Sequence, residues 1–181
     1  PTRYRARLMY DGTQFKGMQY QPNAPTVQGA IERALTTRTQ QQVRVVAAGR
    51  TDTGVHARGQ TVHFDLDKPY DPAELERSLY SMLPSDVRVV GVELAPETDA
   101  VGRPWHAMYW ATGKQYTYRF HGGVGMDPMQ RLYRYQCMRR PLDLEAMQHA
   151  AKLLATSTTL KKPKSPRGLV AIEEARDCVN D

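Results

Sequence analysis

The stretch from residue 43 to residue 66 constrains the fold most, because a glycine-rich turn separates two strand-like runs. The run at 43–48 is apolar, and the run at 61–66 carries apolar residues at alternate positions, a pattern typical of strands. The twelve residues between these runs contain three glycines, one acid, Asp52, and two arginines, Arg50 and Arg58. Glycine allows a close approach of the backbone to a ligand. The segment therefore predicts a strand, a turn that displays Asp52 and a second strand; an Asx turn, in which Asp52 bonds only its own backbone, is the alternative.

Strand and helix signals also mark the rest of the chain. The helix signals are an N-cap followed by an apolar stripe, with Asp71 and Asp143 as the caps. We expect strands over 3–10, 87–94 and 115–120 and helices over 71–83 and 143–154.

Composition favours a soluble globular protein that binds a polyanion. The 181 residues are 40% hydrophobic and 24% charged, and the net charge of +6 favours nucleic acid as a partner. No apolar run approaches the roughly 20 residues of a membrane span, and no secretory signal is present. Because the sequence starts at Pro1 instead of Met, we expect a processed or trimmed terminus, or a sequence that is given only in part. We therefore expect a cytoplasmic or organellar protein, mitochondrial or plastid after loss of a targeting peptide, that is neither secreted nor membrane-bound.

Cysteine and histidine spacing gives no metal signal. Cys137 and Cys178 lie far apart without a CxxC motif, so we expect reduced thiols. His56 and His63 have no partners at metal-ligand spacing, and His56 is expected to brace the turn by hydrogen bonding. No Walker or dinucleotide-binding glycine motif occurs.

The glycine-rich turn resembles the catalytic motif of TruA-type tRNA pseudouridine synthases. Their pattern G-R-T-D-x-G-V-H-A is matched at every specified position from Gly49 to Ala57. The resemblance implies that Asp52 is the catalytic carboxylate of an isomerase that converts uridine to pseudouridine in tRNA. That reaction cleaves a glycosidic bond and rejoins the base through carbon, so no cofactor is expected.

Further segments carry the same resemblance in the same order, from residue 3 to about residue 154. The family's usual Trp is replaced by Met18 and its usual Arg by Met108. The matching segments are Tyr10–Gly17, the first helix Thr26–Leu35, Trp105–Ala107 and the K-x-Y-x-Y strand Lys114–Tyr118.

The resemblance completes the fold prediction. The order β, α, β, β, α, β, β, α, β predicts an α+β fold with a mixed, largely antiparallel sheet and helices on one face, because successive strands tend to pair antiparallel. Residues 1–154 would form a catalytic domain equivalent to the family's N-terminal half, and 155–181 a basic linker with a remnant of the second half. The family's later helix with a Met-Val-Arg motif has no match here. We therefore expect a C-terminally incomplete fold, whether residues are missing from the sequence or were lost by the protein.

The site prediction combines the turn with an aromatic strand. Arg50 is assigned to the active site and Arg58 to a contact with an RNA phosphate. The positive charges of these two arginines would also keep the Asp52 carboxylate ionised. Tyr116 is the expected stacking ring for the uracil and Tyr118 the second choice, with packing across strands as the alternative for both.

The expected partner is tRNA or another structured RNA. Its contacts are predicted to include a basic strand face and a basic tail. The protein is expected to form a homodimer or to be a subunit of a ribonucleoprotein. The alternative function is that of a non-catalytic RNA-binding subunit in a ribonucleoprotein such as an organellar ribosome. The predicted basic contacts are Arg3, Arg5, Arg7, Lys161, Lys162, Lys164 and Arg167, besides the two turn arginines.

Overall fold

The chain forms two compact units, Pro1–Ala111 and Thr112–Asp181, each described here by itself. The structure is a computed structural model that describes residues 1–98, 102–137, 142–156 and 169–174. The catalytic domain predicted from the sequence, residues 1–154, spans both units and stays a prediction. No helix within the described ranges is both long and apolar enough to cross a bilayer.

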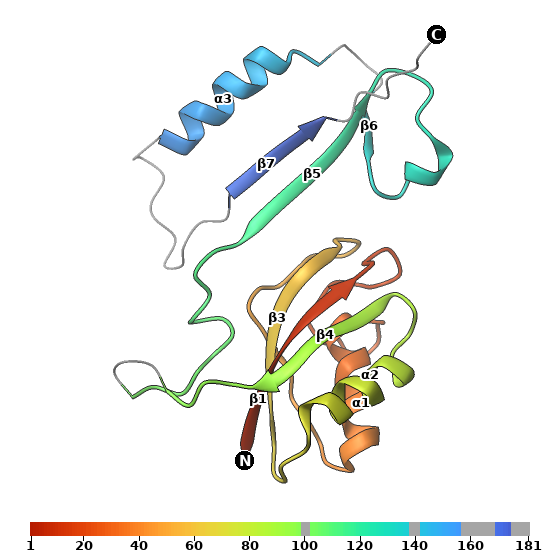
Figure 1. Cartoon of the computed structure of the whole chain (residues 1–181). Coiled ribbons are helices and arrows are strands. Elements are labelled where there is room, and N and C mark those ends of the chain that lie inside the picture. Colours follow the sequence, from red (N-terminus) through yellow and green to blue (C-terminus); the bar gives the residue numbers. More distant parts are fainter. Residues whose placement is uncertain (99–101, 138–141, 157–168, 175–181) are drawn as a thin grey trace. The chain divides into compact units, whose positions relative to one another are not determined.

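Unit 1 is an antiparallel sheet with two helices on one of its faces (Figure 1). The strand order is β2-β3-β1-β4, with β1 in contact with both β3 and β4. The strands are β1 (Thr2–Tyr10), β2 (Val46–Ala47), β3 (Ala57–Leu66) and β4 (Val87–Leu94), and the helices are α1 (Val27–Thr39) and α2 (Pro72–Met82).

Alternation along β1 and β3 builds the core of unit 1. Tyr4 and Phe64 are opposite each other in the register, both are buried, and their rings stack with centroids 5.6 Å apart. Because successive strand side chains point to opposite faces, the residues between them lie on the second face of the sheet. Leu35 of α1 and Leu75 of α2 belong to the same core, which fixes the helices on the first face.

Each helix of unit 1 begins at a side-chain cap. Thr26 accepts a hydrogen bond from Gly29 N at 3.2 Å, and Asp71 accepts one from Glu74 N at 2.9 Å. The Asp71 cap predicted from the sequence is therefore confirmed. Helix α1 runs farther than its sequence signal and ends at Thr39, followed by the C-cap residue Gln40, which has a left-handed φ of 56°.

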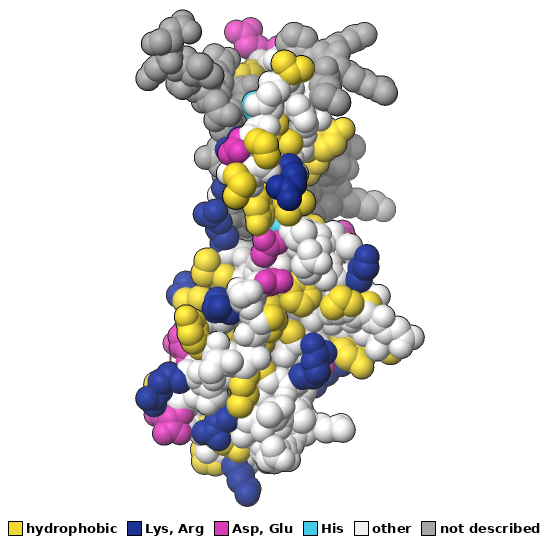
Figure 2. All heavy atoms as spheres, turned by 90° about the vertical axis from the view of Figure 1, so that its right-hand side faces the viewer, with side chains coloured by type: hydrophobic (Ala, Val, Ile, Leu, Met, Phe, Trp, Pro, Cys, Tyr) yellow, Lys and Arg dark blue, Asp and Glu magenta, His cyan; other side chains and the backbone are white. Residues whose placement is uncertain are grey.

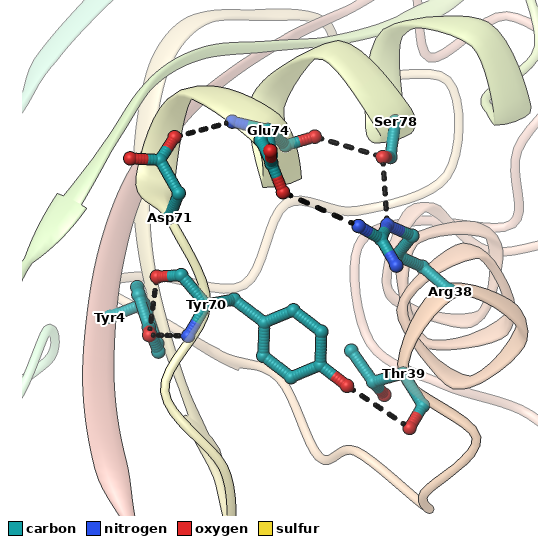
Figure 3. A network of polar contacts seen from close by, with 7 residues as sticks. All are labelled: Tyr4, Arg38, Thr39, Tyr70, Asp71, Glu74 and Ser78. Carbon is teal, nitrogen blue, oxygen red and sulfur yellow. Dashed lines mark hydrogen bonds and ion pairs between the residues drawn. The ribbon is translucent and has the colours of Figure 1, made fainter.

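A polar network joins the two helices to β1 (Figure 3). The Tyr4 hydroxyl donates to Tyr70 O at 2.9 Å and accepts from Tyr70 N at 2.8 Å, while Tyr70 Oη donates to Thr39 O at 3.4 Å. Arg38 of α1 donates from Nε to Ser78 Oγ of α2 at 2.9 Å and lies over the Tyr70 ring. The network fixes the C-terminal end of α1 against α2.

Unit 2 contains a parallel sheet with the strand order β6-β5-β7. Its elements are β5 (Gln115–Gly122), a 3-10 turn (Pro128–Gln130), β6 (Tyr135–Cys137), α3 (Leu144–Thr156) and β7 (Leu169–Glu174). Asp143 accepts a hydrogen bond from Ala146 N at 2.9 Å, as expected for the cap of α3. The structure has one antiparallel and one parallel sheet together with helices, which confirms the predicted α+β class. The consecutive strands β4 and β5 do not pair with each other, because they belong to different sheets.

Candidate active site

The turn that carries Asp52 connects β2 to β3 in unit 1. Asp52 and Arg50 are exposed on it, and Arg58 is exposed at the start of β3. The predicted strand–turn–strand unit is therefore present, with a β3 that begins at Ala57, earlier than the sequence pattern indicates. The three charged side chains come from one short stretch of backbone and are open to solvent.

The backbone of this turn is bonded to the segment that follows β1. Met18 N donates to Thr51 O at 3.0 Å, and Gly54 N donates to Phe15 O at 3.3 Å. Within the turn, Val55 N donates to Asp52 O at 3.2 Å. Residues on both sides of Asp52 are thus held by the 10–18 segment, which restricts where its carboxylate can lie.

Side chains complete this bracing at both ends of the turn. Tyr10 Oη and Thr51 Oγ1 are hydrogen-bonded at 2.7 Å, and Gln60 Nε2 donates to Gly49 O at 2.5 Å. Burial raises the pKa of Tyr10, so its hydroxyl stays protonated at neutral pH and the hydrogen bond is preserved. Asp52 therefore follows directly after an anchored residue.

Two glycines permit the close contact between the turn and the 10–18 segment. A Cβ on Gly12 would lie 2.6 Å from the carbonyl carbon of Val55 and closer still to its oxygen. A Cβ on Gly17 would lie 2.7 Å from Thr51 O, and Gly17 also has a left-handed φ of 92°. No side chain larger than hydrogen fits at these two positions without moving backbone.

His56 connects the turn to the end of β1, as the sequence predicted. Its Nδ1 lies 3.1 Å from Gly12 N and 3.0 Å from Asp11 Oδ1. A neutral Nδ1 accepts from the Gly12 amide, whereas a protonated Nδ1 donates to the carboxylate, so either form keeps the imidazole against the same loop. The side chain therefore braces the turn. Among the described residues no group of three or more His, Cys, Asp or Glu side chains is placed to hold an ion.

Ion pairs occupy part of the arginine face predicted on β1. Arg3 forms a two-pronged pair with Asp65 of β3 at 2.7 Å per hydrogen bond, and Arg5 Nε lies 2.9 Å from Glu93 Oε1 of β4. The Asp65 pKa is lowered, chiefly by this hydrogen bond from Arg3. Arg7 is exposed further along the strand. The expected uniform basic face is therefore partly neutralised, since Arg3 and Arg5 have acidic partners within the protein.

Charge is also dispersed on the face of the molecule that Figure 2 shows. Among the described residues there, Lys and Arg side chains are scattered between hydrophobic and uncharged ones and form no single patch. The predicted tail contacts, Lys161, Lys162, Lys164 and Arg167, lie outside the described residues. On this face, charge alone does not mark an RNA-binding surface.

The two predicted stacking tyrosines belong to unit 2. Tyr116 is 55% exposed and Tyr118 is 61% exposed on β5. Tyr118 contacts the buried Phe120, with ring centroids 6.2 Å apart. The predicted site residues therefore belong to both units: Arg50 and Asp52 lie on the turn of unit 1, Arg58 at the adjoining start of β3, and the two tyrosines on β5 of unit 2.

Most of strand β1, the turn and the strands around it lie within a segment whose sequence matches one known protein family. The chain belongs to the tRNA pseudouridine synthase family, whose sequence model matches residues 6–109 and so includes β1, the turn and β4. That family is the one indicated by the turn motif.

Individual relatives agree with this assignment. The chain is 40% identical over 150 residues to tRNA pseudouridine synthase A of Ligilactobacillus salivarius, covering 82% of this chain and 56% of the relative. It is 45% identical over 152 residues to tRNA pseudouridine synthase A of Halalkalibacterium halodurans, covering 83% and 55%. A third relative, tRNA pseudouridine synthase A 1 of Protochlamydia amoebophila, is 39% identical over 156 residues, covering 86% and 58%. The chain thus spans little more than half the length of the curated relatives it matches.

Proposed function

We propose that this chain forms the catalytic part of an isomerase that converts uridine to pseudouridine in tRNA, with Asp52 as the essential carboxylate. The observation that carries the proposal is the geometry of the turn. An exposed acid lies between two residues whose backbones are bonded to another segment, Thr51 to Met18 and Gly54 to Phe15. A reacting carboxylate needs both access to substrate and a fixed position, and this turn supplies both.

The chemistry requires a carboxylate and does not require an external electron or phosphoryl donor. The bond between C1′ of the ribose and N1 of uracil breaks, the base turns, and a bond forms between C1′ and C5; C5 then loses its proton and N1 gains one, so that the product is an isomer of the substrate. Asp52 acts either as a nucleophile on the sugar or as a base that removes a proton there, and a carboxylate is suited to both. No cofactor enters this proposal.

The neighbouring cations would bind the RNA backbone around the reacting nucleotide. Arg50 is two residues before Asp52 and Arg58 is six residues after it, both exposed. Phosphate contacts from these guanidiniums would set the position of the strand, whereas pocket contacts would select the base. In this proposal Tyr116 of unit 2 stacks on the extruded uracil, and Tyr118 is the second choice.

The remaining expectations are proposals about the whole protein. Residues 1–154 would be the catalytic domain, and 155–181 a basic linker. A homodimer, or a place in a ribonucleoprotein, would supply further contacts with RNA.

The test is the formation of pseudouridine in an unmodified tRNA transcript by the whole protein. We expect Asp52→Asn, which keeps the size of the side chain and removes its charge, to lower kcat by at least about 10³-fold while tRNA binding persists. Asp67→Asn is the matched control, since Asp67 is an exposed aspartate in the same unit outside the turn. Isomerisation that survives Asp52→Asn would disprove the assignment. Binding of tRNA without isomerisation by the wild-type protein would favour the non-catalytic alternative.

A further inference from the structure

An irregular segment is fixed to the sheet of unit 1 by two long-range hydrogen bonds. Arg3 Nη1 of β1 donates to Trp105 O at 2.7 Å, and Ala107 N donates to His63 Nδ1 of β3 at 3.2 Å. Arg3 and His63 alternate with the core residues of their strands, so both lie on the sheet face opposite the helices. The described segment 102–111 therefore packs on that second face.

Ring contacts lead from His63 on the sheet through His106 to Tyr109, edge-on for the first pair and stacked for the second. His63 is 4% exposed, and its ring centroid lies 4.6 Å from that of His106. The His106 ring in turn stacks on Tyr109, with centroids 4.2 Å apart and an interplanar angle of 24°. Tyr109 is 80% exposed. One face of the Tyr109 ring is thus supported by protein while most of its surface meets water.

Backbone amides hold His106, the ring on which Tyr109 stacks. Met108 N donates to His106 Nδ1 at 3.2 Å, which fixes the orientation of the imidazole, and Trp110 N donates to His106 O at 2.9 Å. Burial, followed by the charge of Arg3, lowers the pKa of His106, so its ring is neutral at pH 7. The stack is an uncharged, preformed aromatic surface.

The stack lies beside the base of the active-site turn. Ala48, Trp105 and Ala107 pack together in one apolar cluster, with Trp110 against it. Ala48 directly precedes Gly49, where the turn begins, and its amide donates to Thr61 O of β3 at 2.8 Å. The segment with Tyr109 is therefore joined by packing to the residue from which the Asp52 turn emerges.

Exposed rings of this kind are typical of proteins that bind unpaired nucleotides. A base stacks on an aromatic side chain regardless of its identity, because every base has a π face. The geometry points to Tyr109, supported by His106, as a stacking site for a base of the bound RNA that flanks the reacting uridine. This inference rests on the proposed function for the identity of its ligand as RNA. The Tyr109 site would give unit 1 a second contact with the RNA, in addition to the Asp52 turn.

Tyr80 provides a matched control in the same unit. It is an exposed tyrosine, at 63%, but the guanidinium of Arg88 lies 5.0 Å from its ring centroid, and it projects from α2, which covers the other sheet face. The test therefore uses three variants. Tyr109→Ala removes the supported ring, Tyr109→Phe keeps a ring at that position, and Tyr80→Ala removes an exposed ring on the other side of the sheet.

The experiment measures tRNA affinity of the whole protein over a range of salt concentrations. Loss of one stacked base predicts a Kd about 5- to 150-fold higher for Tyr109→Ala, and a Kd within about 2-fold of wild type for Tyr109→Phe and Tyr80→Ala. Because the ring carries no charge, the slope of log K against log salt stays unchanged. Arg58→Gln, by contrast, should reduce that slope by about 0.7 to 0.9 if Arg58 contacts a phosphate.

A fluorescent base identifies the contact directly. 2-Aminopurine placed beside the converted uridine should be quenched on binding to the wild-type protein and to Tyr109→Phe, and less so on binding to Tyr109→Ala. An unchanged Kd for Tyr109→Ala, or a loss of affinity that accompanies dissociation of a protein oligomer, would overturn the stacking site. If the wild-type protein made no pseudouridine and Tyr109→Ala still weakened tRNA binding at constant slope, the isomerase proposal would fail and the stacking site would stand.

Discussion

Gly12 offers the most direct test of the idea that the Asp52 turn is positioned by its neighbour. The perturbation is Gly12→Ala, a single added methyl group. Gly12 has no left-handed φ, so alanine meets no conformational barrier of its own there. The methyl group would, however, meet the backbone of Val55, which unlike the end of a flexible side chain cannot turn aside. The substitution therefore isolates the contact between the two segments.

The size of the effect follows from the distances. An ordinary contact begins at 3.4 Å, and the added carbon would lie 2.6 Å from the Val55 carbonyl carbon. The two segments must then part by at least about 0.8 Å, and by more to clear the nearer carbonyl oxygen, which strains the hydrogen bond from Gly12 N to His56 Nδ1. A displacement of about 1 Å at a reacting group costs about 10²-fold in rate. We expect kcat/KM for tRNA to fall about 10²-fold.

Stability should change much less than activity, because the turn is exposed and the core of unit 1 does not include it. Overpacking costs about 1–3 kcal/mol, or at most about 10 °C in Tm for a protein of this size. The assay is pseudouridine formation in a tRNA transcript, with thermal unfolding measured on the same samples. Gly113→Ala is the control, since a Cβ at Gly113 meets nothing within 4 Å. Wild-type kcat/KM and Tm in Gly12→Ala would refute the argument that this close approach positions Asp52.

Two further predictions concern the stability of unit 1. Burial, together with the charges of Arg3 and His106, lowers the pKa of His63 from 6.5 to about 4. Between these two pH values the unfolded chain binds a proton at His63 that the folded protein does not bind. The free energy of unfolding should therefore fall as the pH drops from about 6.5 to about 4, by on the order of 3 kcal/mol. His63→Asn, whose Oδ1 can accept from Ala107 N, should flatten the urea unfolding free energy across that pH range, and an unchanged pH dependence would count against the buried neutral imidazole. Tyr4→Phe removes the hydroxyl that bonds both backbone groups of Tyr70 and should lower the unfolding free energy by about 1–3 kcal/mol. A urea midpoint equal to that of wild type would show that water replaces the hydroxyl.

Local signals in the sequence predicted most elements of unit 1. The Asp71 cap and the alternation in β1 and β3 depend on neighbours in the chain, and such features are readable without a structure. The strand predicted over the run at 43–48 is shorter in the structure, because only Val46–Ala47 pairs as β2. Val45 N instead donates to Glu32 Oε1 of α1 at 2.9 Å, a partner that strand periodicity does not reveal.

The contacts that decide the second sheet face were not predictable in this way. Arg3 and Asp65 are separated by 62 positions, and His63 and Ala107 by 44. A period-two pattern places Arg3 and His63 on that face but does not say what covers it. The sequence therefore predicted a basic face where the structure has ion pairs and an aromatic segment, and it gave no sign that His63 is buried or that His106 supports Tyr109.

For the candidate site, the turn motif predicted that Asp52 is displayed, and the structure has Arg50 and Asp52 exposed on the turn and Arg58 exposed at the start of β3. Its bracing by the 10–18 segment depends on tertiary contacts, although Gly12 and Gly17 are visible in the sequence as small residues. Glycine alone does not identify which backbone approaches it. The roles of Asp52, the two arginines and the unit 2 tyrosines stay predictions.

The central place of β1 in its sheet has a consequence for how the protein is made. β1 precedes both of its partners in the chain, and the nearer one, β3, begins only at Ala57. During synthesis at roughly 5–20 residues per second, Tyr4 and Leu8 therefore wait several seconds before either edge of their strand can be paired. For that interval the nascent chain carries a strand with one apolar face and no partner on either edge, so folding of unit 1 cannot begin from its central strand.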